Sequence, residues 1–254
     1  MKMRLKRKTG IVLTCLPFIF LSQHSSAQEQ TQQEPIEGGG LAVVAKVSTL
    51  GPGIELDYSF NENWNLRLQG NGYTYSDTFE EDDIDYNGEI ELSTYGMLVD
   101  WRPFGGVFRV SGGAYINDNE LRGSAISAGS ETFEIGDLEY RGSSSDPLTL
   151  DTAIVLGDET AGYLGFGWGQ SYEDGFMFSL EIGVLFSGEP DVQLEVAGTA
   201  EVVGYPGYQF DVNGDSPEAM EFQANVDQEV ASLQEDISDF EVYPVIALGI
   251  GYRF

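Results

Sequence analysis

The residues of this sequence that could do chemistry are charged side chains at every second position of otherwise apolar or small-residue stretches. This spacing puts the charges on one face of a β-strand and the apolar residues on the other. In a membrane barrel the charges must face the lumen, because Arg or Lys at the bilayer midplane costs about 2 to 4 kcal/mol. We therefore expect a lumen network of paired charges made of Lys46, Glu55, Asp57, Arg67, Asp100, Arg102, Arg109, Glu181 and Arg253.

One end of the predicted strands collects most of these charges. Four cations and two acids fall there: Arg67, Arg102, Arg109, Arg253, Asp57 and Asp100. Four cations cannot be held in a narrow cavity without acids between them, because an unpaired buried charge is costly. We expect a hydrogen-bonded network that closes the periplasmic half of the lumen and stabilises it.

The same charges offer little for catalysis. The one His, His24, and the one Cys, Cys15, lie in an N-terminal segment that we expect to be removed. Mechanisms that pair Ser or Asp with His are then excluded, as are disulfides and Cys-based metal sites. A carboxylate enzyme built from Asp57, Asp100 and Glu181 is conceivable, but structural ion pairing explains the same residues. We expect no enzyme activity, no catalytic residue and no cofactor.

A calcium-like spacing occurs in the acidic segment 80–88, which contains Asp-x-Asp-x-Asn-Gly. The position that requires a bidentate Glu is Thr94, so the match to a calcium loop fails. Asn87-Gly88 between alternating stretches instead predicts a hairpin turn. The second acidic cluster, residues 211–215, has the same interpretation, and we expect no metal site in either segment.

Eight segments with period-two alternation are expected to position the charges. In the last one, 242–254, every second residue back from Phe254 is apolar, whereas the other face is mostly small or polar. Alternation over about ten residues is typical of a transmembrane β-strand with one side in lipid. The other segments cover 41–48, 54–60, a strand from 64 with an expected bulge at 70–75, a strand that ends at 101, 108–116, 164–169 and 176–186. The sequence thus predicts an all-β fold, an eight-stranded antiparallel transmembrane β-barrel.

The connections between these segments are of two kinds. Short reversals at 61–63, 103–106 and 171–175 suit the periplasmic side, whereas long polar segments at 117–160 and 188–240 suit extracellular loops. The short loop at 49–53 breaks this alternation. In the last long segment, Ser216-Pro217 predicts a helix start. Its apolar stripe, expected to pack on the barrel rim or neighbouring loops or else to bind a partner, is Val226, Val230, Leu233, Ile237 and Phe240.

Aromatic residues gather in the apolar phase at the predicted periplasmic strand ends. They form an expected aromatic girdle at the membrane interface: Tyr58, Phe60, Trp64, Trp101, Phe108, Trp168, Phe176, Tyr252 and Phe254. Tyr252 and Phe254 also resemble the C-terminal signal that the barrel assembly machinery recognises. We therefore expect that machinery, the lipid bilayer and lipopolysaccharide as partners.

The start of the chain reads as an export signal. Residues 1–27 combine basic residues, an apolar run and a small-residue cleavage site, so we expect a signal peptide, then a flexible periplasmic lead-in at 28–40 and the barrel at 41–254. No later stretch approaches about 18 consecutive apolar residues. Without the leader, seven basic residues remain against 42 acidic ones, which argues against nucleic acid as a partner. The expected location is the cell outer membrane.

Several motifs of the chain resemble the carbapenem-associated outer-membrane protein family. They are Tyr163-Leu164-Gly165-Phe166-Gly167, Glu181-Ile182-Gly183, Ser187-Gly188-Glu189-Pro190-Asp191-Val192, and an acidic helical stretch before Tyr243-Pro244-Val245. The resemblance covers most of the mature chain and is clearest over residues 160–254. It implies an eight-stranded barrel associated with uptake of ornithine or other basic amino acids and with carbapenem entry.

Two function classes follow. The resemblance favours a narrow uptake channel for small cationic solutes such as basic amino acids. The physics of an eight-stranded barrel favours a non-conducting structural or interaction barrel that displays acidic loops, because its interior is just wide enough for its own side chains.

Overall fold

The computed structural model describes residues 40–254 except 82–83, 130, 137, 170–173 and 206. The chain divides into two units, Met1–Glu37 and Gly38–Phe254, and the second contains the described residues. The expected signal peptide and nearly all of the expected lead-in therefore lie outside the described residues. Most of the predicted turn at 171–175 lies outside them as well.

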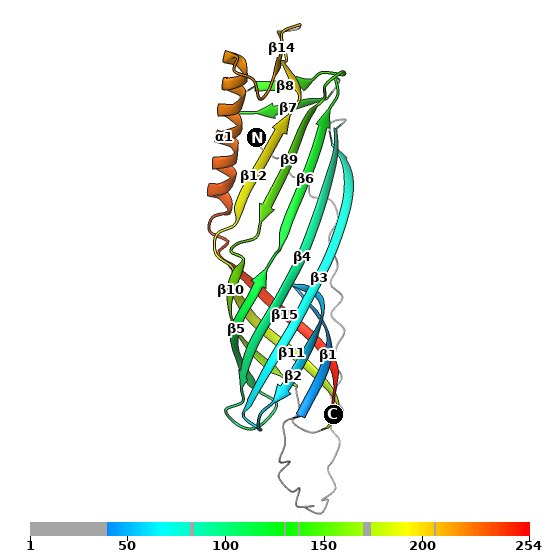
Figure 1. The fold of residues 1–254 in the computed structure, drawn as a ribbon, viewed down its shortest axis with the longest axis vertical. Coiled ribbons are helices and arrows are strands. Elements are labelled where there is room, and N and C mark those ends of the chain that lie inside the picture. The colour runs from blue at the N-terminus through cyan, green and yellow to red at the C-terminus, as the bar shows by residue number, and fades with distance from the viewer. Residues whose placement is uncertain (1–39, 82–83, 130, 137, 170–173, 206) are drawn as a thin grey trace, which may run out of the picture. The chain divides into compact units, whose positions relative to one another are not determined.

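Eight antiparallel strands of this unit close into a ring, seen in the lower part of Figure 1. Strand pairing runs β1–β2–β3–β4–β5–β10–β11–β15 and returns to β1. The strands are β1 (Gly40–Ser48), β2 (Gly51–Ser59), β3 (Trp64–Glu81), β4 (Ile84–Trp101), β5 (Arg109–Asn117), β10 (Thr160–Trp168), β11 (Gly175–Phe186) and β15 (Val242–Arg253). The predicted fold class is confirmed: the chain folds as an eight-stranded β-barrel of the outer-membrane type.

The period-two pattern of the sequence produces the two faces of this ring. In β10, Tyr163, Gly165 and Gly167 are buried inside, whereas Leu164, Phe166 and Trp168 point outward and are 40 to 50% exposed. The other strands repeat this arrangement, so a band of large apolar side chains covers the outside. Such a band is unfavourable in water and matches the hydrocarbon core of a bilayer.

One end of the barrel, which we call the short-turn end, carries the reversals after Ser59, Trp101 and Trp168 together with the chain terminus. The predicted girdle aromatics lie there on the outer face and contact one another in small groups. Trp64 stacks on Trp101 with ring centroids 6.4 Å apart, and Tyr252 contacts both Phe176 and Phe254. The opposite end is the long-loop end.

The hairpin of β3 and β4 differs from the sequence prediction in two ways. All 18 residues of β3 pair with β4 in one unbroken register, so the bulge expected at 70–75 is absent. Asn87 and Gly88 lie inside β4 opposite Thr78 and Asp77, so the hairpin turn predicted there is wrong. The two strands reverse between Glu81 and Ile84 instead. Asn87-Gly88 does not form a turn because β4 pairs there with β3 on one edge and with β6 on the other.

Beyond the ring, β4 continues into a second group of strands at the long-loop end, which we call the distal sheet. Its strands β6 (Glu120–Ser127), β9 (Leu148–Val155) and β12 (Asp191–Ala197) pair in that order from β4 (Figure 1). A separate sheet contains β7 (Thr132–Ile135), β8 (Leu138–Gly142), β13 (Thr199–Val202) and β14 (Gln209–Asp211). The segment 117–160, predicted as a long polar loop, is therefore largely β-structure, and the described part of the segment 188–240 contains three short strands and a helix.

Helix α1 (Pro217–Ile237) covers these sheets and begins where the sequence predicts. The Ser216 hydroxyl accepts a hydrogen bond from the Ala219 amide at 3.1 Å and caps the helix. Ala219, Phe222 and Val226 are buried against the sheets, and Val230 is partly buried. Leu233 and Phe240 are 39% and 67% exposed, so the packing expected for the apolar stripe does not extend to its C-terminal part. The segment 211–215 joins β14 to α1 and is not a hairpin between strands.

No helix among the described residues combines the length and apolar character of a membrane span.

Phe222 is expected to hold the helix to the sheets. It is fully buried and contacts Tyr140 edge-on with ring centroids 4.8 Å apart. Phe222→Ala should destabilise the packed helix by about 3 to 5 kcal/mol, because it leaves a cavity. Thermal unfolding followed by the helical circular dichroism signal measures this change. Met220→Ala, which truncates an exposed side chain of the same helix, should leave the transition nearly unchanged; equal shifts would contradict the packing role of Phe222.

Candidate functional site

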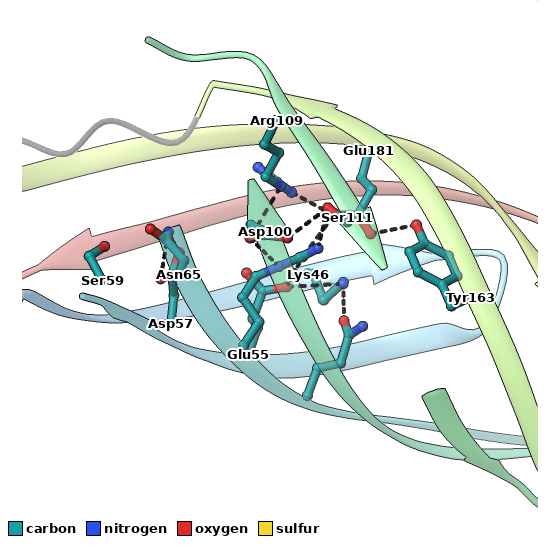
Figure 2. A network of polar contacts seen from close by, with 12 residues as sticks. Lys46, Glu55, Asp57, Ser59, Asn65, Asp100, Arg109, Ser111, Tyr163 and Glu181 are labelled. Atoms are coloured by element: carbon teal, nitrogen blue, oxygen red, sulfur yellow. Dashed lines mark hydrogen bonds and ion pairs between the residues drawn. The ribbon is translucent and has the colours of Figure 1, made fainter. Parts of the chain in front are cut away.

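The lumen of the barrel contains all nine charged residues that the sequence assigns to it, and none is more than 8% exposed. They come from β1, β2, β3, β4, β5, β11 and β15 and from the residue that follows β4. Figure 2 shows many of them pointing toward one another across the ring. The structure brings eight of the nine into ion pairs with one another and leaves Arg102 outside them.

Arg67 of β3 lies at the centre of the network. Its Nη1 donates to the Glu55 carboxylate at 2.8 Å and to Glu181 at 2.7 Å, and its Nε lies 2.7 Å from an Asp100 oxygen. Its Nη2 donates to the Ser111 hydroxyl at 2.9 Å, and that hydroxyl donates to Asp100 at 2.7 Å. One guanidinium thus joins β2, β3, β4, β5 and β11.

Glu181 of β11 extends the network toward β5 and β10. One of its oxygens accepts from Arg109 Nη2 at 2.5 Å as well as from Arg67. The other accepts from the Tyr163 hydroxyl at 2.6 Å. Arg109 Nε lies 3.6 Å from Asp100, so Arg109 shares both of its acids with Arg67.

On the long-loop side of Arg67, Lys46 of β1 joins the network. Its ammonium pairs with Glu55 at 3.3 Å and also donates to the Gln69 side-chain oxygen. Gln69 in turn donates to the hydroxyl of Tyr115, whose ring contacts Tyr163 edge-on at 5.5 Å. The two tyrosines therefore contact each other, and each is also hydrogen-bonded to the polar network.

Toward the short-turn end, Asp57 forms a second, smaller group. It accepts two hydrogen bonds from Asn65, at 2.9 and 3.1 Å, and lies 3.5 Å from Arg253 Nη2. Arg253 Nη1 also donates to the Ser59 hydroxyl at 2.7 Å. Figure 2 shows Asp57, Asn65 and Ser59 apart from the side chains that surround Asp100 and Glu181.

Arg102 departs from the expected pairing. It is 1% exposed, and its three guanidinium nitrogens have no hydrogen-bond partner among the residues the structure describes. Only its backbone is fixed, by the Asn63 carbonyl and the Asn63 side chain, at 2.8 Å each. Asp57 and Asp100 form their hydrogen bonds with other donors, and none of these bonds reaches the Arg102 side chain.

Inward glycines make room for the large side chains. A Cβ on Gly167 would lie 2.6 Å from the guanidinium carbon of Arg109, and one on Gly96 would meet the Tyr115 ring at the same distance. Gly165 and Gly183 similarly accommodate the Tyr163 hydroxyl. Gly165 and Gly167 therefore face a crowded part of the lumen.

An apolar layer, packed together with the two tyrosines, also fills the lumen. Leu50, Leu98, Leu185 and Val245 are each at most 2% exposed and pack together with Ala161, Tyr115 and Tyr163. Charged side chains and apolar side chains therefore both fill the lumen. An eight-stranded ring is narrow enough for its own side chains to do this.

The sequence reasoning missed the uncharged members of the site: Asn65, Gln69, Ser111, Tyr115 and Tyr163. All five lie in the inward phase of their strands, and that phase was the available signal. Their pairing with particular charges depends on the stagger between strands, which a single strand's pattern does not contain.

A groove lies outside the barrel, on the distal sheet. This groove of about 780 Å³ is lined by hydroxyl, amide and acidic side chains, with Glu89, Asp151 and Glu195 near a single Arg122. Arg122 pairs with Glu120 at 2.7 Å and Glu91 at 3.4 Å, and these side chains are largely or partly exposed. No group of three or more His, Cys, Asp or Glu among the described residues is arranged to hold a metal ion.

Loss of the central cation should be costly. Arg67→Met leaves Glu55, Asp100 and Glu181 with fewer partners, so it should lower the free energy of unfolding by about 3 to 5 kcal/mol. Denaturant unfolding of the refolded protein in micelles, followed by tryptophan fluorescence, measures this. Arg122→Met removes exposed ion pairs and should leave the midpoint unchanged, since such pairs contribute little. An Arg67→Met midpoint equal to that of Arg122→Met would show that the lumen pairs do not stabilise the barrel.

Comparison with known proteins supports the fold. No protein-family model matches the chain, and no curated protein matches it. The crystal structure of Acinetobacter baumannii CarO is similar with a TM-score of 0.51 and 19% identity over 85% of this chain and 98% of that one. Acinetobacter baumannii CarO2 is similar with a TM-score of 0.52 and 18% identity over the same shares. At such identity the likeness shows a common fold, the outer-membrane type of β-barrel.

Proposed function

We propose that this protein is an outer-membrane barrel, closed at rest, that admits small basic solutes such as ornithine or lysine when the side chains in its lumen rearrange. The observation that carries this proposal is the chemistry of the closure. A large part of it consists of ion pairs between flexible side chains, which can exchange partners.

A basic solute can enter such a network by exchange. Glu55 is shared between Lys46 and Arg67, and Lys46 is itself an ammonium group on a flexible stem. A lysine or ornithine side chain presents the same group, so it can take the place of Lys46 on Glu55 without leaving a carboxylate unpaired. A neutral solute cannot, because it would leave buried charges without partners.

The acidic residues of the distal sheet also favour cationic solutes. The groove of this sheet carries several carboxylates around one arginine, and the whole chain has 42 acidic residues against 12 basic ones. A surface of this sign raises the local concentration of cations. We place it on the extracellular side, because long connections of outer-membrane barrels face outward and short turns face the periplasm.

The apolar layer favours a second candidate, a non-conducting barrel that anchors the distal sheet and α1 as a structural or interaction domain. Leu50, Leu98, Leu185 and Val245 oppose the passage of any ion, because a charge has no partner at that level. In this case the network would serve only to hold the barrel together.

Solute-driven swelling of liposomes containing the refolded protein separates the two candidates. For an uptake barrel, we expect faster swelling with ornithine than with a neutral amino acid of similar size. Leu98→Ala, which opens the apolar layer, should increase both rates several-fold, and Glu55→Gln should reduce the preference for ornithine. Met220→Ala is the matched control, since it lies on α1 away from the lumen. Absence of ornithine flux in the unmodified protein and in Leu98→Ala would leave the non-conducting barrel.

Assembly in the outer membrane is part of this proposal, with the bilayer, lipopolysaccharide and the barrel assembly machinery as partners. Phe254 is 68% exposed and groups with Tyr252, so it is available to that machinery. Phe254→Asp should lower the amount of folded protein in the outer membrane, measured by heat-modifiable gel mobility. Phe240→Asp changes an equally exposed Phe outside the ring and should assemble normally. Normal levels of folded Phe254→Asp would remove the argument for this signal.

A further inference from the structure

We propose that Arg102 binds the carboxylate of a small solute at the short-turn end of the lumen. The inference rests on the proposed function for the identity of the solute, an α-amino acid, but not for the existence of the site. Its basis is a buried guanidinium whose three nitrogens have no hydrogen-bond partner among the described residues.

The orientation of Arg102 follows from strand alternation. It continues the inward phase of Leu98 and Asp100, and its amide and carbonyl groups are bonded to Asn63, which holds the backbone in register with β3. The side chain therefore points into the lumen. It is 1% exposed, so bulk water does not solvate the charge.

The charge balance of the lumen leaves Arg102 as the excess. Among the described residues of the lumen, five buried cations face four buried acids: Lys46, Arg67, Arg102, Arg109 and Arg253 against Glu55, Asp57, Asp100 and Glu181. Guanidinium keeps its proton in proteins, so the imbalance cannot be removed by deprotonation. An uncompensated buried charge is strongly unfavourable, and an anion would relieve that cost.

The acids near Arg102 are already engaged. Asp57, Asp100, Arg109 and Arg253 are close enough to act electrostatically on it. Asp57 binds Asn65 and Arg253, and Asp100 binds Ser111, Arg67 and Arg109. Arg109 Nη1 likewise has no hydrogen-bond partner among the described residues. Two arginines at this end of the lumen thus retain free donors.

A carboxylate is the ligand that suits these donors. The guanidinium group presents parallel N–H bonds that match the two oxygens of a carboxylate. A basic amino acid carries this group together with an ammonium group that the lumen acids can accept. In this proposal the α-carboxylate of the solute binds Arg102, and an acid of the lumen binds its ammonium group.

Ornithine and putrescine form a matched pair of probes, because putrescine is the same diamine without the carboxylate. Binding of each to the refolded protein in micelles can be measured by calorimetry. We expect the unmodified protein to bind ornithine and acetate, and Arg102→Gln to bind both at least about tenfold more weakly. Arg102→Lys should have an intermediate affinity, since it keeps the positive charge but not the parallel N–H donors of the guanidinium group. Arg141→Gln changes a partly exposed arginine of β8, away from the lumen and the groove, and should bind like the unmodified protein.

A stability measurement tests the same site without any ligand. Because Arg102 is unpaired, Arg102→Met should leave the unfolding midpoint unchanged or raise it, whereas Arg67→Met should lower it. A fall of similar size in both variants would show that Arg102 is paired within the protein and would overturn the proposal. Equal affinity of the unmodified protein and Arg102→Gln for ornithine would also overturn it.

The proposed function and this site can fail separately. Binding in micelles does not require conduction, so carboxylate binding that depends on Arg102 in a protein without ornithine flux would support the site and contradict uptake. Ornithine flux that is insensitive to Arg102→Gln, together with no loss of affinity, would support uptake and contradict the site.

Discussion

The contacts of the Arg67 guanidinium are the interaction on which the rest of the barrel depends. Three carboxylates from three different strands approach this one cation. A single positive charge cannot balance three acids, so Arg109 and Lys46 are needed on Glu181, Asp100 and Glu55. Lys46 brings β1 into the network, and Arg109 adds a second link to β5. The charges therefore join the strands across the lumen, in addition to the hydrogen bonds that join neighbours around the ring.

This arrangement follows from the size of the ring. With eight strands, the interior has room for side chains and little else, so each inward residue must satisfy its neighbours. Large side chains are placed opposite glycines, as with Arg109 at Gly167 and Tyr115 at Gly96. Polar groups that are buried together must also bond together, because an unsatisfied buried group costs about 1 to 3 kcal/mol. The unpartnered nitrogens of Arg102 are therefore the feature that the stability of the closed barrel does not explain.

Much of the fold could be predicted from the sequence, because alternation of side chains is a local property of each strand. The number of barrel strands and the inward phase of all nine charges followed from it. What alternation cannot give is the stagger between strands, so the partners of each charge were not predictable, and Arg102 was wrongly expected to be paired. The strands of the distal sheet were also missed. These strands face water on one side. They therefore lack the strong difference between a polar and an apolar face that a lipid-facing strand shows.

Helix α1 also shows that local sequence predicts an element but not its tertiary packing. Its start was predictable because Ser216 and Pro217 act locally. Its buried face was predicted only in part: Val226 is buried as expected, but tertiary packing also buries Ala219 and Phe222 and leaves Leu233 exposed near the end. The apolar stripe is a property of the helix alone, whereas the extent of the sheets beneath it decides how much of that stripe is covered.

The weakened alternation at residues 70–75, interpreted from the sequence as a bulge, has a physical cause in the structure. Asn71 and Thr94 face each other as the last inward pair of the β3–β4 hairpin and are joined by a hydrogen bond of 3.0 Å. From Gly72 to Thr78, residues of both phases are exposed. At the same level β4 exchanges its neighbour β5 for β6. The β3–β4 hairpin continues without interruption beyond this level, but it no longer belongs to the closed ring. The two faces of the strands therefore stop differing in polarity at the level where the strands leave the ring and the lipid around it.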